Sequence, residues 1–258
     1  MKNKWITFDL DGTLMQNPFI GWVFPEIEQV FQEVSKVNQL NELKFELVID
    51  EHNRRMLEEE IVAAYDWDGI IEQIFTQHNI KHKIDVEALV NKHLSDGKVY
   101  LLEEDILSTL ESLKAKGYKL AIITNGYYKY QAPVLVQLNI YHVFDKIITP
   151  EKIGVAKPNI GMASAFTLED EVIAHVGDRI DHDVRYANEC QTKSIFIMRS
   201  YPDSIVNIPA DERPKQNEVI ELLKKKWNKE IQSQDTAIPA SCIPDCIITS
   251  IKELDKLY

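Results

Sequence analysis

Short apolar runs recur along the chain and predict the strands of a parallel sheet. Each run is three to five residues long and rich in Ile and Val, as is typical of strands buried on both faces. The runs comprise residues 5–8, 120–124, 146–148, 172–176, 194–198 and 246–249. Helical patterns lie between most of them, for example at Ile106, Leu107, Leu110 and Leu113 before Gly117, and at Val134, Leu135 and Leu138. Strands that alternate with helices predict an α/β fold with a Rossmann-like, doubly wound parallel sheet.

The stretch from about Asn17 to Asp96 interrupts this alternation, because it has helical patterns and almost no strand signal. Its apolar residues fall on one helical face in three places: Ile27, Val30, Phe31, Val34 and Val37; Ile70, Ile71, Ile74 and Phe75; and Val86, Leu89, Val90 and His93. We therefore predict a helical domain of residues 17–96, inserted into an α/β core of residues 1–16 and 97–258.

A second irregular segment, residues 201–244, contains five prolines and one amphipathic, lysine-rich helical pattern over about residues 219–231. The pattern includes Lys224–Lys226 beside Trp227. These lysines could form a surface for a partner or a phosphate group. The favoured interpretation is a solvated helix face, packed from below by Ile220, Leu223 and Trp227.

The composition is that of an ordinary globular protein, with 258 residues, 45% of them hydrophobic and 27% charged. The formal charge of -12 opposes binding of a nucleic-acid polymer, although small anions can still bind locally. Three cysteines argue against a disulfide framework and favour a reducing compartment, so we expect a cytoplasmic protein. Neither a signal peptide nor a membrane span is expected, because the apolar runs are short.

Polar residues follow the predicted strands in four places. In open parallel sheets ligands bind outside the carboxyl ends of the strands, so these residues should converge on one cleft. The four segments are Asp9-Leu-Asp11-Gly-Thr13, Thr124-Asn125-Gly126, Lys157-Pro158 and Gly177-Asp178.

These segments combine a group of carboxylates with donors for an anion. Asp9, Asp11 and Asp178 would repel one another unless a cation lay among them, and an oxygen-only site favours Mg²⁺. A phosphate monoester would be bound by the charge of Lys157, by Thr124, and by the backbone N–H groups of Asn125 and Gly126. The pattern therefore predicts a phosphoryl-transfer site.

The order of these segments resembles the haloacid dehalogenase (HAD) superfamily at all four of its signature positions. The matching segments are residues 9–13, 122–126, 154–158 and 176–183. The resemblance covers residue 4 to about residue 198. It implies that the inserted helices of residues 17–96 are a C1-type cap, which is a lid over the site.

The resemblance also implies roles for the residues. Asp9 is expected to be the nucleophile that forms an aspartyl-phosphate, and Asp11 the general acid and base. Asp9, Asp178 and the backbone carbonyl of Asp11 are expected to bind Mg²⁺ directly, with Asp183 supporting the metal through water or outer contacts. Asp181 competes with Asp183 for that role. His182 is expected to be a surface or loop histidine rather than a ligand.

The expected function is Mg²⁺-dependent hydrolysis of a small phosphate monoester, with Asp9, Asp11 and Lys157 as catalytic residues. A phosphotransferase or phosphomutase would use the same intermediate, and a non-catalytic binding protein of the same fold is a further alternative. Asp11 argues against a dehalogenase. Sugar phosphates, nucleotides and other metabolite phosphates all remain open, and the oligomeric state is not indicated. Asn53–Arg55 and Lys81–Lys83 could reach an anionic substrate, but exposed helix or loop positions are favoured for them.

Overall fold

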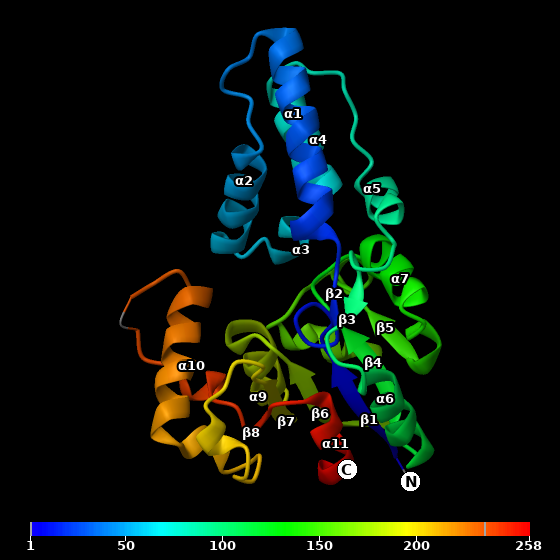
Figure 1. Cartoon of the computed structure of the whole chain (residues 1–258), viewed down its shortest axis with the longest axis vertical. Coiled ribbons are helices and arrows are strands. Elements are labelled where there is room, and N and C mark those ends of the chain that lie inside the picture. The colour runs from blue at the N-terminus through cyan, green and yellow to red at the C-terminus, as the bar shows by residue number, and fades with distance from the viewer. Residues whose placement is uncertain (1, 235) are drawn as a thin grey trace.

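A six-stranded parallel sheet forms the core of the protein (Figure 1). The computed structural model describes residues 2–234 and 236–258. The strands are β1 (Asn3–Phe8), β4 (Lys119–Ile123), β5 (Lys146–Ile148), β6 (Asp170–Gly177), β7 (Lys193–Ile197) and β8 (Cys246–Ile248). Their order across the sheet is β5-β4-β1-β6-β7-β8. All six predicted runs lie in these strands to within a few residues, so the predicted α/β, Rossmann-like fold is confirmed.

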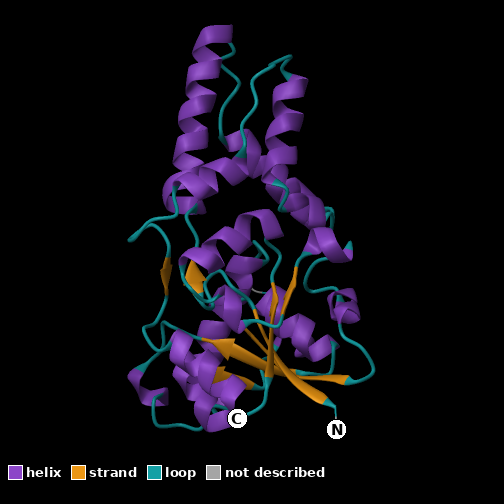
Figure 2. Cartoon of the chain, turned by 90° about the vertical axis from the view of Figure 1, so that its right-hand side faces the viewer, coloured by secondary structure: helices purple, strands orange, loops and turns teal. Residues whose placement is uncertain are grey.

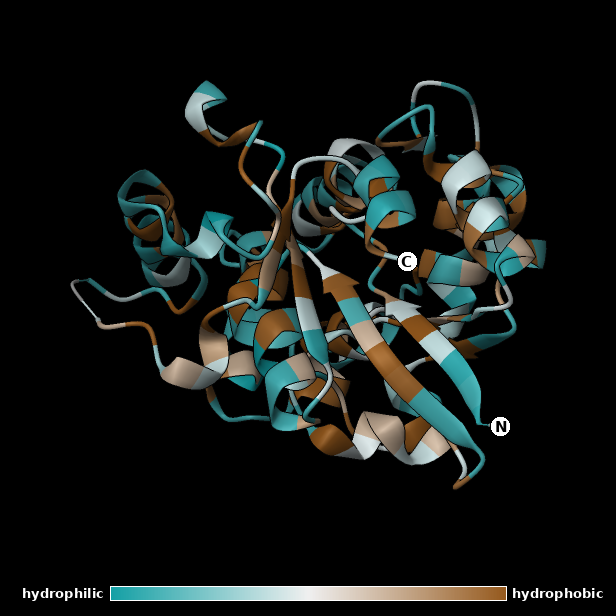
Figure 3. Cartoon of the chain, turned by 90° about the horizontal axis from the view of Figure 1, so that it is seen from below, coloured by the Kyte–Doolittle hydropathy of each residue, from teal (hydrophilic) through white to brown (hydrophobic). Residues whose placement is uncertain are grey.

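The strand ends are aligned at the centre of the sheet. Phe8 at the end of β1 is registered with Ile122 of β4 and with Val176 of β6. The carboxyl-terminal halves of these strands are buried because helices cover both faces of the sheet (Figure 3), as is typical of parallel sheets. The residues that follow β1, β4 and β6 therefore meet at one edge.

The helices of the core pack on the sheet through apolar faces. They are α6 (Ile106–Ala115), α7 (Tyr128–Gln137), α8 (Pro150–Ile153), α9 (Arg185–Glu189), α10 (Asn217–Glu230) and α11 (Leu254–Leu257). Helix α6 buries Ile106, Leu110 and Leu113. It is followed by Gly117, whose φ of +92° is costly for other residues, as the sequence pattern predicted.

A helical insertion, which we define as residues 24–92, rises above the carboxyl edge of the sheet (Figures 1 and 2). It contains α1 (Phe24–Asn38), α2 (Glu46–Leu57), α3 (Ile61–Ala64), α4 (Trp67–Gln77) and α5 (Val86–Lys92). The chain leaves and re-enters the core through a two-stranded antiparallel ribbon of β2 (Met15–Gln16) and β3 (Tyr100–Leu101). The sequence pattern predicted neither this ribbon nor α2.

The lysine-rich pattern forms α10, which lies between β7 and β8 in the chain. Val219, Leu223 and Trp227 are buried in a cluster with Phe196 of β7. Lys224 points to solvent and pairs with Glu221, as a solvated face requires. Among the helices of the described residues, none combines the length and the apolar character that a membrane crossing needs.

Candidate functional site

The carboxyl edge of the sheet brings the four predicted segments together. Asp9 follows β1, and its backbone N–H donates to Val176 O at 2.9 Å. Thr124 follows β4, and its N–H donates to Ile148 O at 3.2 Å. Asp178 follows β6 directly. The backbone hydrogen bonds between neighbouring strands therefore continue as far as Asp9 and Thr124.

Three carboxylates form a group that fits a hard cation. One oxygen each from Asp9, Asp178 and Asp183 lies within 4.8 Å of the others. An oxygen-only donor set of this kind suits Mg²⁺ rather than a soft metal. Gly12, with φ of +82°, makes room for the group, because a Cβ at this position would lie 2.8 Å from Asp178 Oδ2.

Lys157 provides the central positive charge. Its Nζ lies 2.7 Å from Asp9 Oδ1 and 2.5 Å from Asp183 Oδ1, and the residue is 2% exposed. Burial alone would lower the pKa of this amine, but the carboxylates of Asp183 and Asp9 outweigh burial and raise it. Lys157 is therefore charged at neutral pH.

Asn125 holds Lys157 in place. Its Oδ1 accepts from the Lys157 backbone N–H at 2.8 Å, and its Nδ2 donates to Lys157 O at 3.0 Å. The side chain is thus committed within the protein, whereas the sequence pattern assigned Asn125 to phosphate through its backbone. Thr124 Oγ1 accepts from Gly126 N at 3.1 Å, which leaves the hydroxyl proton of Thr124 as a donor.

Asp11 lies next to the carboxylate group and is oriented by Gln131 of α7. Gln131 Nε2 donates to Asp11 Oδ2 at 2.6 Å, whereas Asp11 Oδ1 has no partner among the described residues. The Gln131 side chain passes close to Gly126 on its way to Asp11. A Cβ at position 126 would lie only 2.2 Å from Gln131 Nε2, so a glycine is needed there. Sequence reasoning missed Gln131. The available signal was a glutamine on the apolar side of a helix.

Burial raises the pKa of the carboxyl groups in the site. The pKa of Asp9 rises to about 7 because burial outweighs the opposing charge of Lys157. The pKa of Asp11 also rises to about 7, through burial and then through the charge of Asp9. Burial raises that of Asp178 to about 6. A bound cation would lower all three, because it favours the carboxylate form.

Asp183, rather than Asp181, joins the carboxylate group. Asp183 Oδ1 lies 3.2 Å from His175 Nε2, and its Oδ2 accepts from the backbone N–H of Arg179 at 2.9 Å. Burial would raise the pKa of Asp183, but Lys157 and His175 outweigh it, so the pKa is lowered. Asp181 instead receives two hydrogen bonds from the Arg179 guanidinium, at 2.9 and 2.6 Å.

His182 differs from the expectation of a surface histidine. The residue is 5% exposed, because the turn of residues 180–184 directs the ring beneath the site, toward Asn125. Burial, with the nearby Arg179 charge, lowers its pKa to about 4. The ring is therefore neutral.

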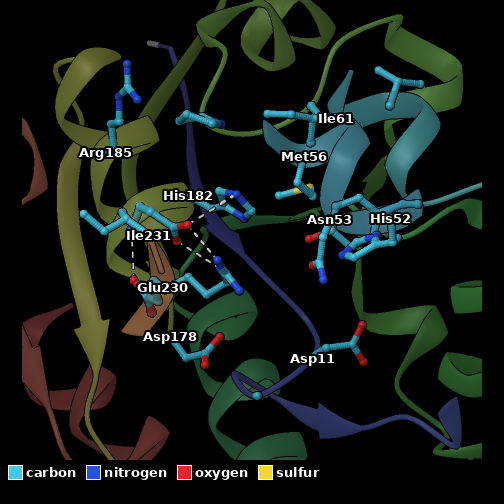
Figure 4. A pocket seen from close by; sticks show the side chains of 18 of the residues that line it. Asp11, His52, Asn53, Met56, Ile61, Asp178, His182, Arg185, Glu230 and Ile231 are labelled. Atoms are coloured by element: carbon cyan, nitrogen blue, oxygen red, sulfur yellow. Dashed lines mark hydrogen bonds and ion pairs between the residues drawn. The ribbon is translucent and has the colours of Figure 1, made fainter. Parts of the chain in front are cut away.

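A cavity of about 1600 Å³ lies between the carboxyl edge of the sheet and the helical insertion (Figure 4). The core side contributes Asp11, Asp178 and Arg179. The insertion contributes residues of α2 and of the segment that follows it, among them His52, Asn53, Met56, Ile61 and Tyr65. A ligand in this cavity would contact both parts of the molecule.

Helix α10 contributes a further wall. Glu230 Oε2 accepts from the backbone N–H groups of Ile180 and Asp181, at 2.9 and 3.2 Å. Lys226 Nζ lies 3.9 Å from Asp178 Oδ2 and 3.0 Å from Glu230 Oε1. The interpretation of α10 as a solvated face is therefore incomplete, because one of its lysines reaches the carboxylate group.

The chain is similar to known proteins. A family model described as haloacid dehalogenase-like hydrolase matches residues 6–197. The glyceraldehyde 3-phosphate phosphatase of Methanocaldococcus jannaschii is 28% identical over 202 residues, which cover 76% of this chain and 85% of that protein. Matches to two further proteins of that name span only 56% and 42% of those proteins.

Two other matches extend over nearly whole chains. The phosphoglycolate phosphatase of Haemophilus influenzae is 27% identical over 219 residues, which cover 81% of this chain and 90% of that protein. The crystal structure of a HAD phosphatase from Thermococcus onnurineus covers 100% of this chain and 97% of its own, with a TM-score of 0.61 and 21% identity. At 21% identity, the match to the Thermococcus onnurineus structure shows that the fold is shared.

Proposed function

This chain belongs to the family of haloacid dehalogenase-like hydrolases, and from that premise we propose that it is a Mg²⁺-dependent phosphohydrolase. Its substrate is a small phosphate monoester, which it cleaves through an aspartyl-phosphate on Asp9. The observation that carries the proposal is the position of Asp9, 2.7 Å from the buried Lys157 and within the group of three carboxylates. Both named relatives are phosphatases, which supports the same chemistry.

Lys157 and Thr124 bind and orient the phosphoryl group. The Lys157 ammonium and the Thr124 hydroxyl are donors at the same edge as Asp9. A carboxylate oxygen of Asp9 attacks phosphorus, and the bond from phosphorus to the ester oxygen breaks. The phosphoryl group is then covalently bound to Asp9.

Asp11 transfers the protons of both half-reactions. It donates a proton to the departing alcohol and then accepts one from the water that attacks the phosphorylated Asp9. Gln131 occupies Asp11 Oδ2, so Oδ1 is the oxygen that is free for this transfer. Burial raises the pKa of Asp11, which opposes the lowering expected from a bound cation and so favours a group that can both give and take a proton.

Asp9, Asp178 and the backbone carbonyl of Asp11 are the proposed ligands of Mg²⁺, and Asp183 supports them. When bound, Mg²⁺ would neutralise the carboxylates and draw electron density from the phosphoryl oxygens. Asp183 is fixed by Lys157, His175 and the Arg179 N–H, so it can orient the metal site without being displaced.

The proposal extends to the division of the chain and to its alternatives. Residues 17–96 form a C1-type cap over a core of residues 1–16 and 97–258, and the three free cysteines fit a cytoplasmic protein. A phosphotransferase or phosphomutase would pass the phosphoryl group of Asp9 to an acceptor hydroxyl instead of water. A binding protein without turnover would need none of these groups.

Phosphate release tests the proposal. Native protein, Asp9→Asn and the matched control Asp50→Asn, an exposed carboxylate on α2, are incubated with p-nitrophenyl phosphate and a panel of metabolite phosphates. Turnover that needs Mg²⁺, survives in the control and is lost in Asp9→Asn is expected. Turnover that persists in Asp9→Asn would contradict the assigned nucleophile, and transfer to an added alcohol in place of water would favour the transferase.

A further inference from the structure

Three polar groups of the helical insertion face the carboxylates across the cavity and have no hydrogen-bond partner among the described residues. They are Nε2 of His52, the amide of Asn53 and the hydroxyl of Tyr65. Figure 4 shows His52 and Asn53 on α2, on the side of the cavity opposite Asp178. Polar groups left unpaired in a cavity are the ones available to a ligand.

We propose, on the basis of the phosphohydrolase function above, that these groups select a substrate whose alcohol part is uncharged and carries hydroxyl or carbonyl groups. Phosphate esters of polyols and of small sugars belong to this class. Phosphate esters that carry a carboxylate are disfavoured.

His52 presents a hydrogen-bond acceptor to the cavity. Its Nδ1 lies 2.7 Å from Ala64 O, and because a carbonyl only accepts, Nδ1 carries the hydrogen. The ring stacks on Trp67, with centroids 4.9 Å apart and planes at 27°. Burial lowers the pKa of His52, so the ring is neutral and Nε2 accepts. A substrate hydroxyl can donate to it.

Asn53 and Tyr65 complete the set with groups that can donate and accept. Asn53 follows His52 on α2, and its amide offers both functions. Tyr65 follows α3, and burial raises the pKa of its phenol, so the hydroxyl stays protonated at neutral pH. Tyr65 lines the same cavity as Asp11 and Asp178.

The insertion offers no cation to a substrate carboxylate. Among the described residues, its part of the cavity lining includes no lysine or arginine but does include the acidic Glu59. Arg54 and Arg55, the cations of α2, line a neighbouring hollow that adjoins the cavity at Glu59, Ile61 and Val62, and they are not among the residues that line the cavity itself. Arg54 pairs with Glu51 at 2.8 Å, and Arg55 pairs with the same carboxylate at 2.8 Å.

The core cations around the cavity are mostly paired as well. Arg179, Arg185 and Lys226 each contact a carboxylate, at 2.6, 2.7 and 3.0 Å, and Lys229 is exposed on α10. Lys157 is occupied by Asp9 and Asp183, where the phosphoryl group belongs. A second anionic group on the substrate would therefore lose its hydration, and among these cations only the exposed Lys229 at the outer end of α10 has no carboxylate partner.

Two matched pairs of esters test this selectivity. Each pair differs only in a hydroxymethyl group or a carboxylate: glycerol 3-phosphate against 3-phosphoglycerate, and 2-hydroxyethyl phosphate against 2-phosphoglycolate. We expect kcat/KM to be about 10-fold or more higher for the uncharged member of each pair, which corresponds to about 1.4 kcal/mol. Equal values, or a preference for the carboxylates, would overturn the proposal.

Variants of Asn53 make the test specific to this face. Asn53→Ala should lower kcat/KM for glycerol 3-phosphate and narrow the difference within the pair. Asn53→Arg should raise kcat/KM for 3-phosphoglycerate, which misfolding cannot produce. Asp50→Asn, exposed on the same helix, should leave both values unchanged. If Asn53→Ala and Asn53→Arg both retained the native ratio, the assignment of this face would be wrong.

Separate experiments test the proposed function and the proposed substrate selectivity. Turnover of p-nitrophenyl phosphate tests the first, whereas calorimetric binding of the paired esters to Asp9→Asn tests the second without turnover. Tighter binding of glycerol 3-phosphate than of 3-phosphoglycerate supports the selectivity even in an inactive protein. Tighter binding of 3-phosphoglycerate overturns it even in an active one.

Discussion

Gln131 fixes the carboxyl group of Asp11, because its amide N–H donates to Oδ2 at 2.6 Å and leaves only Oδ1 without a partner among the described residues. Replacing it by Leu removes a hydrogen bond to a charged group and leaves Asp11 free to rotate. We expect Gln131→Leu to lower kcat by about 10- to 100-fold, from a bond of about 1.5–3 kcal/mol. Gln137→Leu, exposed at the end of the same helix, should have no effect.

Comparing substrates with different leaving groups tests whether Gln131 acts by orienting Asp11 or only by packing. Alkyl phosphates need a proton from Asp11 more than p-nitrophenyl phosphate does, because an alcohol is a poorer leaving group than a nitrophenol. Gln131→Leu should therefore lower kcat more for glycerol 3-phosphate than for p-nitrophenyl phosphate. Equal losses for the two substrates would indicate that Gln131 acts only through packing.

The raised carboxyl pKa values couple stability to pH and to Mg²⁺. Without a cation, Asp9 and Asp11 titrate at about 7 and Asp178 at about 6 in the folded protein, against the ordinary 3.8. The folded state then binds more protons than the unfolded chain between these values. The contribution of the three groups to stability is therefore complete below about pH 4 and is lost as the pH rises to about 7.

Mg²⁺ should reverse this loss, because it binds the deprotonated carboxylates. We expect saturating Mg²⁺ to raise Tm by about 5 °C or more at about pH 8, and by much less at about pH 5. Thermal unfolding with Mg²⁺ or with a chelator at the two pH values measures the difference. A Mg²⁺ effect that is equal at both values would argue against a site made of these carboxylates.

Residues at strand ends could be predicted from the sequence, and residues that reach the site from elsewhere could not. Asp9, Asp178 and Lys157 occupy short segments whose position relative to the strands implies their convergence. Gln131 contacts a residue 120 positions away, and Glu230 contacts Ile180, 50 positions away. No local pattern encodes such contacts, because they depend on how whole helices pack.

At the scale of elements, buried strands were visible in the sequence and the insertion was visible only in part. The strands of the sheet are mostly apolar and buried toward their carboxyl ends, since both faces are covered there. The strands β2 and β3 have two residues each, which is too short for any periodicity. Helix α2 has only Val48 and Arg55 fully buried, because its other side faces the cavity, so its apolar face is sparse.

Helix α10 reaches the carboxylate group through one lysine. Lys226 Nζ lies 3.9 Å from Asp178 Oδ2 and so competes with a cation for that carboxylate. We expect Lys226→Met to strengthen Mg²⁺ binding, lowering its Kd by about 3- to 10-fold, a modest effect because the lysine is partly exposed. Lys224→Met, on the solvent face of the same helix, should leave Kd unchanged.

Calorimetric titration with Mg²⁺ measures both variants. Weaker Mg²⁺ binding in Lys226→Met would show that the lysine supports the metal site instead of competing with it.

At the scale of the whole molecule, α7 links the core to the insertion. The Tyr130 hydroxyl accepts from Asp68 N at 3.2 Å and donates to Asp68 Oδ2 at 2.9 Å. Tyr127 Oη donates to Val62 O at 3.1 Å. These bonds connect the core to the insertion on one side of the cavity.

Removing the Tyr130 hydroxyl, which makes both hydrogen bonds to Asp68, should loosen the insertion. We expect Tyr130→Phe to raise KM by about 3- to 10-fold with a smaller effect on kcat, because the loss of one or two hydrogen bonds is worth about 1 kcal/mol each. Tyr201→Phe, an exposed tyrosine of the core, is the control. Small-angle scattering should show native protein becoming more compact with Mg²⁺ and vanadate. The absence of compaction would contradict a moving insertion.

The ribbon of β2 and β3 has a consequence for engineering. Met15 is paired with Leu101, so the chain departs from the core and returns to it at adjacent points, about one strand spacing of ~4.8 Å apart. Everything between these points could be exchanged for another helical unit with similarly spaced ends. Asp9, Asp11, Lys157 and Asp178 all lie outside the exchanged part. A transplanted insertion should thus change which alcohol is released while the phosphorylation of Asp9 continues as before.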